Sequence, residues 1–331
     1  MENLHQRFLK FINILGPTIG LALVVIIFMI FELPREKVLT SGGGWKVILV
    51  QTSVIAVGAM GMTLIIASGG IDLSAGSVIA MTSVLGAQLA AMGYPAPVVA
   101  LAVVGSGALI GLINGAVIVG FRMVPFIVTL GMMGIARGLA KWAGNNQAVN
   151  ISTEAPARDF VDSFMGIEMI NRFLPLPAGL WCTLILGVVM ALVLNRSVFG
   201  RHIFAIGSNE ETARLCGIKV GLKKIMIYTL GGVFFGLAGL MMLSRLRQGD
   251  PTTAIGKELE IIAAVVIGGA SLNGGSGSIP GAMIGVLIMG VLSQCAQIMG
   301  WPSYFQEIII GIIIILAVGV DKWRRSQFSG G

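Results

Sequence analysis

Charged residues are scarce in this sequence: 11% of its 331 residues are Asp, Glu, Lys or Arg, whereas 56% are hydrophobic. Soluble domains carry about 25% charged residues. A soluble chain this apolar could not cover its own surface with polar side chains, so lipid must be part of its solvent. The net charge of +7 would suggest nucleic acid as the partner of a soluble protein. In a membrane protein it instead reflects orientation, because Lys and Arg are retained on the cytoplasmic side, and we expect no nucleic-acid partner.

Histidine and cysteine are also rare. The two histidines, His5 and His202, and the three cysteines, Cys182, Cys216 and Cys295, are far apart in the chain. Such spacing forms neither a disulfide framework nor a metal site, so we expect no metal and no cofactor. The phosphate-binding loop G-x-x-x-x-G-K-[ST] is missing as well, and the most similar sequence, IGKE at 255–258, lacks its first Gly and its hydroxyl residue. We therefore expect that this chain is not an enzyme and does not hydrolyse ATP itself.

Long apolar runs, in contrast, are abundant. Crossing the hydrocarbon core takes about 20 apolar residues in a helix, and the runs 11–31 and 47–67 contain no charged residue. Backbone polar groups in lipid must be satisfied within their own segment, so these runs are helices. We predict an all-α fold, a polytopic transmembrane bundle of about ten spans forming one domain over residues 1–331. The spans are 11–31, 47–67, 72–92, 97–119, 123–143, 178–195, 225–244, 258–272, 279–299 and 303–320, and the eighth is the shortest.

The distribution of positive charge predicts the orientation. An even number of spans places both termini on one side. The connection 196–224 carries six cationic residues, namely Arg196, Arg201, Arg214, Lys219, Lys223 and Lys224. Because Lys and Arg mark the cytoplasmic side, we expect this connection and both termini to be cytoplasmic. The long gap 144–177 mixes both signs of charge with several prolines, and we expect it to be an external loop.

One similarity is internal to the chain. GGIDLSAGS at 69–77 and GGASLNGGS at 268–276 both fit G-G-x-x-L-x-x-G-S. Paired Gly-interrupted apolar segments indicate the substrate path of a transporter, although ordinary turns between helices use the same residues. We predict an N-cap role for Asp72, compatible with a place in the pathway. The candidates for the substrate pathway are Gly69, Gly70, Asp72, Ser74, Gln88, Asn114, Gly268, Gly269 and Asn273.

Other polar and small residues in the spans have two explanations each. The amides of Gln51, Gln88, Asn114, Gln294 and Gln297 either line a polar path or hydrogen-bond one helix to another. Arg137 and Lys141, near the end of the fifth span, either snorkel to the interface or serve function. The spans contain no series of buried carboxylates, which counts against a proton-driven carrier. The neutral amides suit a neutral, hydroxyl-rich solute better than an ion. Small-xxx-small spacing predicts close helix packing at Gly107 and Gly111, Gly232 and Gly236, and Gly281 and Gly285.

The connection 200–224 contains the signature of a short helix of about two turns. Ser208 or Asn209 can cap it, Glu210 and Glu211 fall in its first turn, and Gly217 ends it. Such a helix is either an ordinary surface helix or a docking helix for a cytoplasmic partner.

This segment, 207–218, resembles the coupling segment of ABC-transporter permeases of the ribose/xylose/arabinose/galactose type. The stretches 61–77, 111–140 and 258–285 are similar to that family too, in family order, and the resemblance extends from about residue 45 to 321. Departures from the family pattern occur at 41–46 and in the loop 144–177. The resemblance implies that the ATPase contact is made by Ser208, Asn209, Glu210, Glu211, Ala213, Arg214, Leu215, Gly217 and Ile218.

A permease of this type is half of a transporter of the bacterial inner membrane. The resemblance implies a second permease copy or a sister permease, a cytoplasmic ATP-binding subunit and a periplasmic or lipid-anchored sugar-binding protein that delivers a pentose, a hexose or a related polyol. The alternative is a secondary carrier or channel that works without an ATPase, which would not need the segment 200–224. A membrane enzyme would need clustered histidines or carboxylates in the spans, and the sequence has none.

Overall fold

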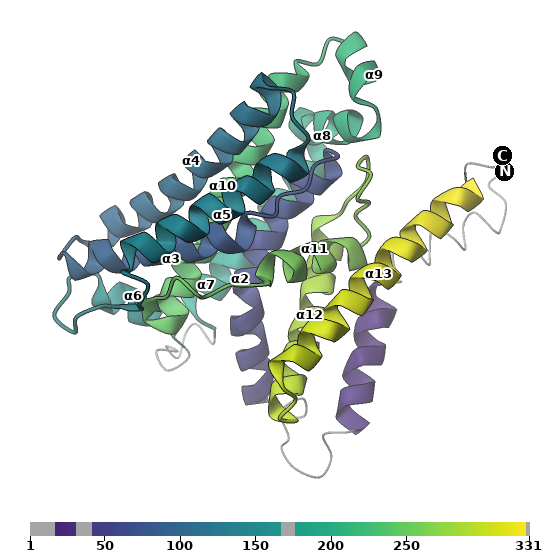
Figure 1. Ribbon diagram of the computed structural model, residues 1–331. Helices are drawn as coiled ribbons and strands as arrows, with labels where there is room; N and C mark the ends of the chain where they lie inside the picture. Colours follow the sequence, from purple (N-terminus) through teal and green to yellow (C-terminus); the bar gives the residue numbers. More distant parts are fainter. Residues whose placement is uncertain (1–16, 31–41, 167–175, 329–331) are drawn as a thin grey trace.

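The helix α2 (Gly42–Ala67) lies at the centre of the computed structural model, which describes residues 17–30, 42–166 and 176–328 (Figure 1). Its apolar stretch is 89% buried by other parts of the chain. A helix that is apolar on all sides is buried on all sides in the core of a helical protein. The apolar stretches of α4 (Ala96–Gly120), α5 (Pro125–Ala143) and α7 (Ala178–Arg196) are only 28% buried, so these three helices form the outside that lipid would cover.

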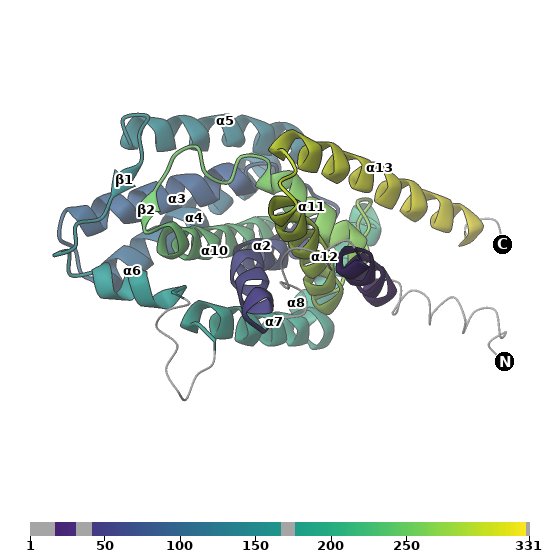
Figure 2. The same ribbon diagram turned by 90° about the horizontal axis from the view of Figure 1, so that it is seen from below.

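The other elements surround α2. Figure 2 shows α3, α4 and α10 on one side of α2, and α12 and α13 on the other. A short antiparallel pairing joins β1 to β2, with Val149 opposite Gly249. The remaining elements are the helix Pro17–Ile30, α3 (Ala75–Ala91), β1 (Val149–Asn150), α6 (Arg158–Phe164), α8 (Val198–Ser208), α9 (Glu210–Leu215), α10 (Val220–Leu246), β2 (Gln248–Gly249), α11 (Lys257–Ile267), α12 (Ile279–Ile298) and α13 (Ser303–Phe328).

Six helices within the described residues are long and apolar enough to cross a membrane, namely α2, α4, α5, α7, α10 and α12. Three further predicted spans correspond to shorter apolar helices, Pro17–Ile30, Ala75–Ala91 and Tyr304–Leu316. The predicted span 258–272 is the exception, because α11 has 11 residues. At 1.5 Å per residue it is about 16 Å long, roughly half the thickness of the hydrocarbon core. This segment therefore cannot cross a membrane by itself.

Two predicted loops contain regular structure. The connection 196–224 holds α8 in addition to the predicted short helix, and α10 begins at Val220. The predicted external loop 144–177 holds β1 and α6, and α6 contacts α10. Residues 167–175 of that loop, together with the N-terminal charges at His5, Arg7 and Lys10, lie outside the described residues.

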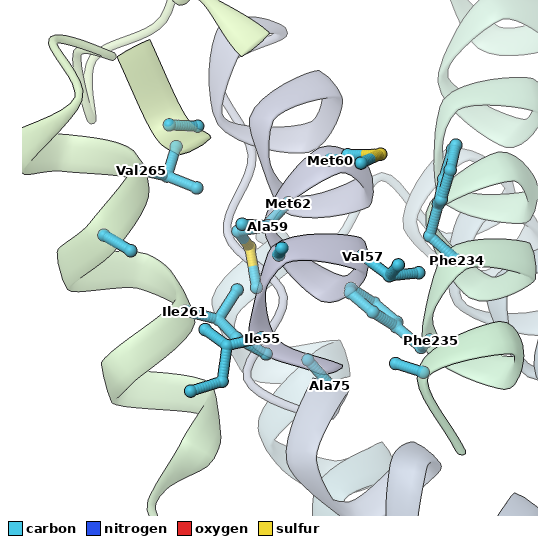
Figure 3. Close-up of a cluster of buried hydrophobic side chains, with 14 of the residues drawn as sticks. Ile55, Val57, Ala59, Met60, Met62, Ala75, Phe234, Phe235, Ile261 and Val265 are labelled. Atoms are coloured by element: carbon cyan, nitrogen blue, oxygen red, sulfur yellow. The ribbon is translucent and has the colours of Figure 1, made fainter. Parts of the chain in front are cut away.

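The main core is formed where α2 passes between α10 and α11. Figure 3 shows Val57 of α2 beside Phe235 of α10, and Ile55 beside Ile261 of α11. All four side chains are at most 6% exposed. Burying one such side chain contributes about 1.5–3 kcal/mol in water, but in lipid close packing of the side chains replaces that term.

Glycines allow the neighbouring helices to approach closely, as their spacing predicts. A Cβ atom at Gly107 of α4 would overlap the carbonyl oxygen of Gly232 and the backbone of Gly236 in α10. On α12, a Cβ at Gly281 or Gly285 would likewise overlap the carbonyl oxygen of Gly268 or Ala264. These three small-xxx-small pairs thus lie at contacts between backbones, and larger side chains there would separate the helices.

Candidate functional site

The predicted coupling segment is a helical corner. The helix α8 ends at Ser208, and Asn209 adopts an extended conformation before α9. The side-chain oxygen of Asn209 accepts a hydrogen bond from the backbone nitrogen of Thr212 over 2.9 Å, so Asn209 and not Ser208 is the cap. Gly217 has a φ of 83°, the left-handed conformation that glycine adopts most easily and that commonly ends helices. The predicted start and end of this helix are both confirmed.

Burial divides the residues of α9 into two faces. Ala213 is 3% exposed and packs with Ile206 and Val220, while Ile218 contacts the same cluster. Both residues therefore support the segment from within, so a direct contact of Ala213 with the ATPase, which the resemblance implies, is not possible in this conformation. Leu215 is 89% exposed. Of the residues predicted to contact the ATPase, the exposed ones are Ser208, Asn209, Glu211, Arg214, Leu215 and Gly217.

Glu210 holds α9 against α10. One carboxylate oxygen accepts from Lys224 of α10 over 2.5 Å, and the other from Arg214 over 3.2 Å. The side chain of Lys224 is 19% exposed, so its pairing with Glu210 is shielded better than an open surface pair. The orientation of α9 is consequently determined both by an apolar cluster beneath it and by an ion pair at its edge.

Both Gly-rich turns meet at this corner. The turn after α2 and the turn after α11 are joined by a hydrogen bond from the backbone nitrogen of Gly275 to the carbonyl oxygen of Ala67, 3.0 Å long. Gly207 of α8 lies between them, because a Cβ atom there would overlap both of these groups. A Cβ at Gly69 would lie 3.7 Å from the Cα of Gly207 and 3.9 Å from the carbonyl oxygen of Asn273. We call Gly69, Gly207, Asn273, Gly274 and Gly275 the glycine junction.

The two turns are similar in conformation, but with a shift of one residue from their sequence motif. Gly69 and Gly269 both have positive φ, 83° and 93°. The next residues in the chain, Gly70 and Ala270, donate backbone hydrogen bonds to Ile65 and Val265. The structural equivalent of Gly69 is therefore Gly269, although the shared motif aligns Gly69 with Gly268. Helix-terminating geometry, rather than the full nine-residue motif, is what the two segments have in common.

Three of the predicted pathway residues form a closed polar cluster. Asp72 is 1% exposed, and its Oδ1 accepts hydrogen bonds from the backbone nitrogen and hydroxyl of Ser74 over 2.8 and 2.5 Å. Its Oδ2 accepts from the side chain of Asn114 in α4 over 3.3 Å. Asp72 thus accepts a backbone N–H bond just before α3, as the capping prediction requires, whereas Ser74, directly before α3, makes no side-chain cap hydrogen bond.

Gln88 and Arg137 connect helices at a distance from this cluster. Gln88 donates a hydrogen bond to the carbonyl oxygen of Ala143, at the end of α5. The guanidinium of Arg137 donates to the carbonyl oxygens of Pro251 and Thr253, over 2.8 and 2.7 Å. Arg137 thus ties α5 to the connection between β2 and α11.

A cavity of about 610 Å³ lies between α2, α10, α11 and α12. Its lining is mixed: apolar side chains such as Val54 and Met242 alternate with polar ones. The polar lining residues are Gln51, Thr52, Ser244, Arg245, Arg247, Lys257, Glu260, Ser293 and Gln297. Cavities of this size, apolar with a few polar groups, are typical ligand sites.

None of the nine predicted pathway residues lines this cavity. Gln51 and Gln297 do, so for these two amides the polar-path explanation is supported. Sequence analysis missed Arg245, Lys257 and Glu260. The available signal was charge at the edge of an apolar run, but the same signal occurs at interfacial residues. Among the described residues, no three His, Cys, Asp or Glu side chains gather as a metal site requires.

Comparison with known proteins places the chain in a family. The family described as branched-chain amino acid transport system / permease component matches residues 46–318. The ribose import permease protein RbsC of Escherichia coli is 40% identical, covering 84% of this chain and 85% of that protein. The L-arabinose ABC transporter permease protein AraH of Azospirillum brasilense is 37% identical, covering 85% and 80%. The fructose import permease protein FrcC of Rhizobium meliloti is 32% identical, covering 98% and 90%.

A solved metal-chelate type ABC transporter in an inward-facing conformation aligns with a TM-score of 0.48 at 13% identity, covering 92% of this chain and 98% of that one. This similarity is too low to establish a shared fold. The family match and the three permease relatives, in contrast, each cover most of the sequence. On that basis, this chain belongs to the permease-component family of the branched-chain amino acid transport type.

Proposed function

We propose that this chain is the membrane-spanning permease subunit of an ATP-driven ABC importer and forms the translocation pathway for a sugar. The observation that carries this proposal is the similarity to permeases named for ribose, L-arabinose and fructose, at 32–40% identity. The chain is a multi-pass protein of the bacterial inner membrane, in agreement with its six long apolar helices. The substrate is a pentose, a hexose or a related polyol.

The proposed topology has ten membrane segments in one domain, with both termini and 196–224 cytoplasmic and 144–177 external. Two features support it. The first is the group of six Lys and Arg residues in 196–224. The second is the length of α10, whose 27 residues separate α9 from β2 by about 40 Å. This exceeds the thickness of the hydrocarbon core, so the two ends of α10 can lie on opposite sides of the membrane. In this topology α11 counts as a segment that enters the membrane without crossing it.

The proposed partners follow from the family. ATP is hydrolysed by a separate cytoplasmic ATP-binding subunit, which docks on the exposed face of α9, with Leu215 at its centre. A sugar-binding protein delivers the substrate from the periplasmic side, and a second permease, identical or a sister, completes the pathway. The glycine junction links the end of α8, directly before α9, to the ends of α2 and α11. We therefore assign Gly69, Gly70, Gly268, Gly269 and Asn273 to the cytoplasmic end of the pathway, where movement of the ATP-binding subunit would be transmitted.

Reconstitution tests this function. The permease is purified with its ATP-binding subunit and inserted into proteoliposomes with its sugar-binding protein. Uptake of labelled ribose, L-arabinose and fructose should require both ATP and the binding protein. Uptake by the permease alone, without any ATPase, would instead identify a secondary carrier or channel.

A further inference from the structure

The N-terminal turn of α11 lines the cavity. Lys257, Glu260 and Ile261 line the cavity, and α11 ends at Ile267 beside the glycine junction. Figure 1 shows α11 between α2 and α13, much shorter than either. Broken helices that end inside a transporter form substrate sites, because the helix end supplies oriented dipoles and unpaired backbone groups at membrane depth. The position of α11 therefore points to the cavity as the place where solute contacts the chain.

Glu260 provides a second, independent indication. Its side chain is buried, at 2% exposed, and it lines the cavity. One carboxylate oxygen, Oε2, pairs with the ammonium group of Lys257. The other, Oε1, is buried and has no hydrogen-bond partner within the described part of the chain. A buried carboxylate oxygen without a donor is costly, so this atom is placed to accept a hydrogen bond from a ligand.

We propose that Glu260 is the specificity-determining residue of a sugar site in this cavity, where its Oε1 accepts a hydrogen bond from one hydroxyl of the solute. The proposal rests on the sugar-permease function above. The amides of Gln51 and Gln297 and the hydroxyl of Ser293 both donate and accept, as sugar hydroxyls do. The site thus matches a neutral polyol and supplies it with acceptors and donors from three helices.

The charges around Glu260 fit a neutral solute. Lys257 pairs with Glu260, and Arg245 of α10 interacts with it electrostatically. The two cations stabilise the ionised carboxylate, and the first turn of α11 favours it as well. A cationic solute would be repelled by Lys257, Arg245 and Arg247, which also lines the cavity. An anionic solute would be repelled by Glu260 at the acceptor position.

A purely structural role for Glu260 is the competing explanation. Acidic residues are favoured in the first turn of a helix, and pairing with Lys257 could be their whole purpose. In a purely structural role, Glu260 would act through Oε2 and its charge alone. Oε1 would then have no partner, and no solute would be bound in preference to another. Solute-dependent protection of the cavity therefore separates the two roles.

The experiment uses a Cys-free chain carrying Val47→Cys, a partly exposed position of the cavity lining outside the proposed hydrogen-bonding set. The chain is purified in detergent with its ATP-binding subunit so that both sides are accessible. The rate of maleimide labelling is measured with increasing ribose, L-arabinose or fructose. We expect the transported sugar to slow labelling severalfold. In Glu260→Gln, protection should require at least about tenfold more sugar, because a hydrogen bond to a charged acceptor is lost.

Glu258→Gln is the matched control, since Glu258 lies in the same turn but does not line the cavity; its protection should equal that of the parent. Unchanged protection in Glu260→Gln overturns the proposal. If Glu260→Gln fails to assemble, Glu260→Asp, which keeps the charge but withdraws the oxygen, must show weakened protection or the proposal is again overturned. Failure of the parent complex to take up any of the three sugars would instead contradict the sugar-permease function, whatever the labelling result.

Discussion

The backbone nitrogen of Gly275 donates a hydrogen bond of 3.0 Å to the carbonyl oxygen of Ala67, which joins the turns after α11 and α2 from opposite halves of the sequence. Gly207, the penultimate residue of α8, occupies the space beside this bond. The coupling segment and the two Gly-rich turns are consequently one structural unit, and a displacement of α8 would act directly on the ends of α2 and α11.

Gly207→Val should disrupt this unit. The added Cβ overlaps the carbonyl oxygen of Ala67 and the nitrogen of Gly275, and overpacking of this kind costs about 1–3 kcal/mol or more. We expect a lower midpoint of thermal unfolding in detergent and loss of ATP-driven uptake. Gly105→Val is the matched control, because no atom lies within 4 Å of a Cβ at that helical position. Equal stability and uptake in the two variants would show that the junction tolerates separation.

Leu215→Asp tests the docking face of α9. Leu215 is 89% exposed, so the free energy of unfolding of the chain should change by no more than about 0.5 kcal/mol. If the ATP-binding subunit packs on this side chain, a buried charge in the contact should abolish copurification of that subunit and ATP-driven uptake. Recovery of the intact complex at the parental yield would exclude Leu215 from the contact.

Ala213→Asp and Gly217→Val should stop uptake by a different route. Ala213 is packed against Ile206 and Val220, so a carboxylate there disrupts α9 itself, at a cost of about 2 kcal/mol or more. Gly217 has a φ of 83°, which costs a β-branched residue about 1–3 kcal/mol. Limited proteolysis of the permease alone should show both variants cleaved faster near 210–218, whereas Leu215→Asp should be cleaved at the parental rate. Parental cleavage in all three variants would contradict the assignment of inner and outer faces.

The cluster of Asp72, Ser74 and Asn114 should act as a brace between the turn after α2 and α4. Asn114→Ala removes the donor to Asp72 Oδ2 and to the Ser74 hydroxyl and should lower the free energy of unfolding by about 1–3 kcal/mol. A double-mutant cycle with Asp72→Ala should give a coupling energy of at least about 0.5 kcal/mol. Additive effects of the two changes would mean that the hydrogen bond contributes nothing.

Cysteine labelling tests the proposed orientation. Ser152 and Ser208 are both exposed and lie in the segments proposed to be external and cytoplasmic. In a Cys-free background, which requires removal of the exposed Cys216, an impermeant maleimide should label Ser152→Cys in intact cells. Ser208→Cys should react only after permeabilisation. The reverse pattern would invert the topology.

Local properties of the chain were predicted correctly from the sequence. Apolar length alone indicated α2, α4, α5, α7, α10 and α12, because satisfying backbone groups in lipid requires a helix whatever its neighbours are. The start and end of α9 were predicted because Asn209 and Gly217 act within one turn of the chain. The Gly-rich spacing of α4 and α10 predicted close packing for a similarly local reason. Glycine has no side chain, so two helix backbones can approach each other closely wherever glycines face a neighbour.

The tertiary structure decided the surroundings of each polar side chain. Gln51 and Gln88 are the same residue type in equally apolar helices, yet Gln51 lines the cavity and Gln88 binds the carbonyl of Ala143. Their roles depend on which helix lies beside each one. The sequence likewise did not indicate that Asp72 also accepts a hydrogen bond from Asn114 of α4. Contacts between segments distant in sequence leave no periodic or spacing signal.

Membrane insertion, the helical fold and the family were therefore determined by the sequence itself, since hydrophobic length, caps and motifs act within single segments. The half-length of α11, the equivalence of Gly69 with Gly269 and the exposure of Glu260 to the cavity were decided only by the assembled structure. Each of these depends on where a helix stops relative to others packed against it, and the free energy that sets this position comes from contacts among α2, α10, α11 and α12 together.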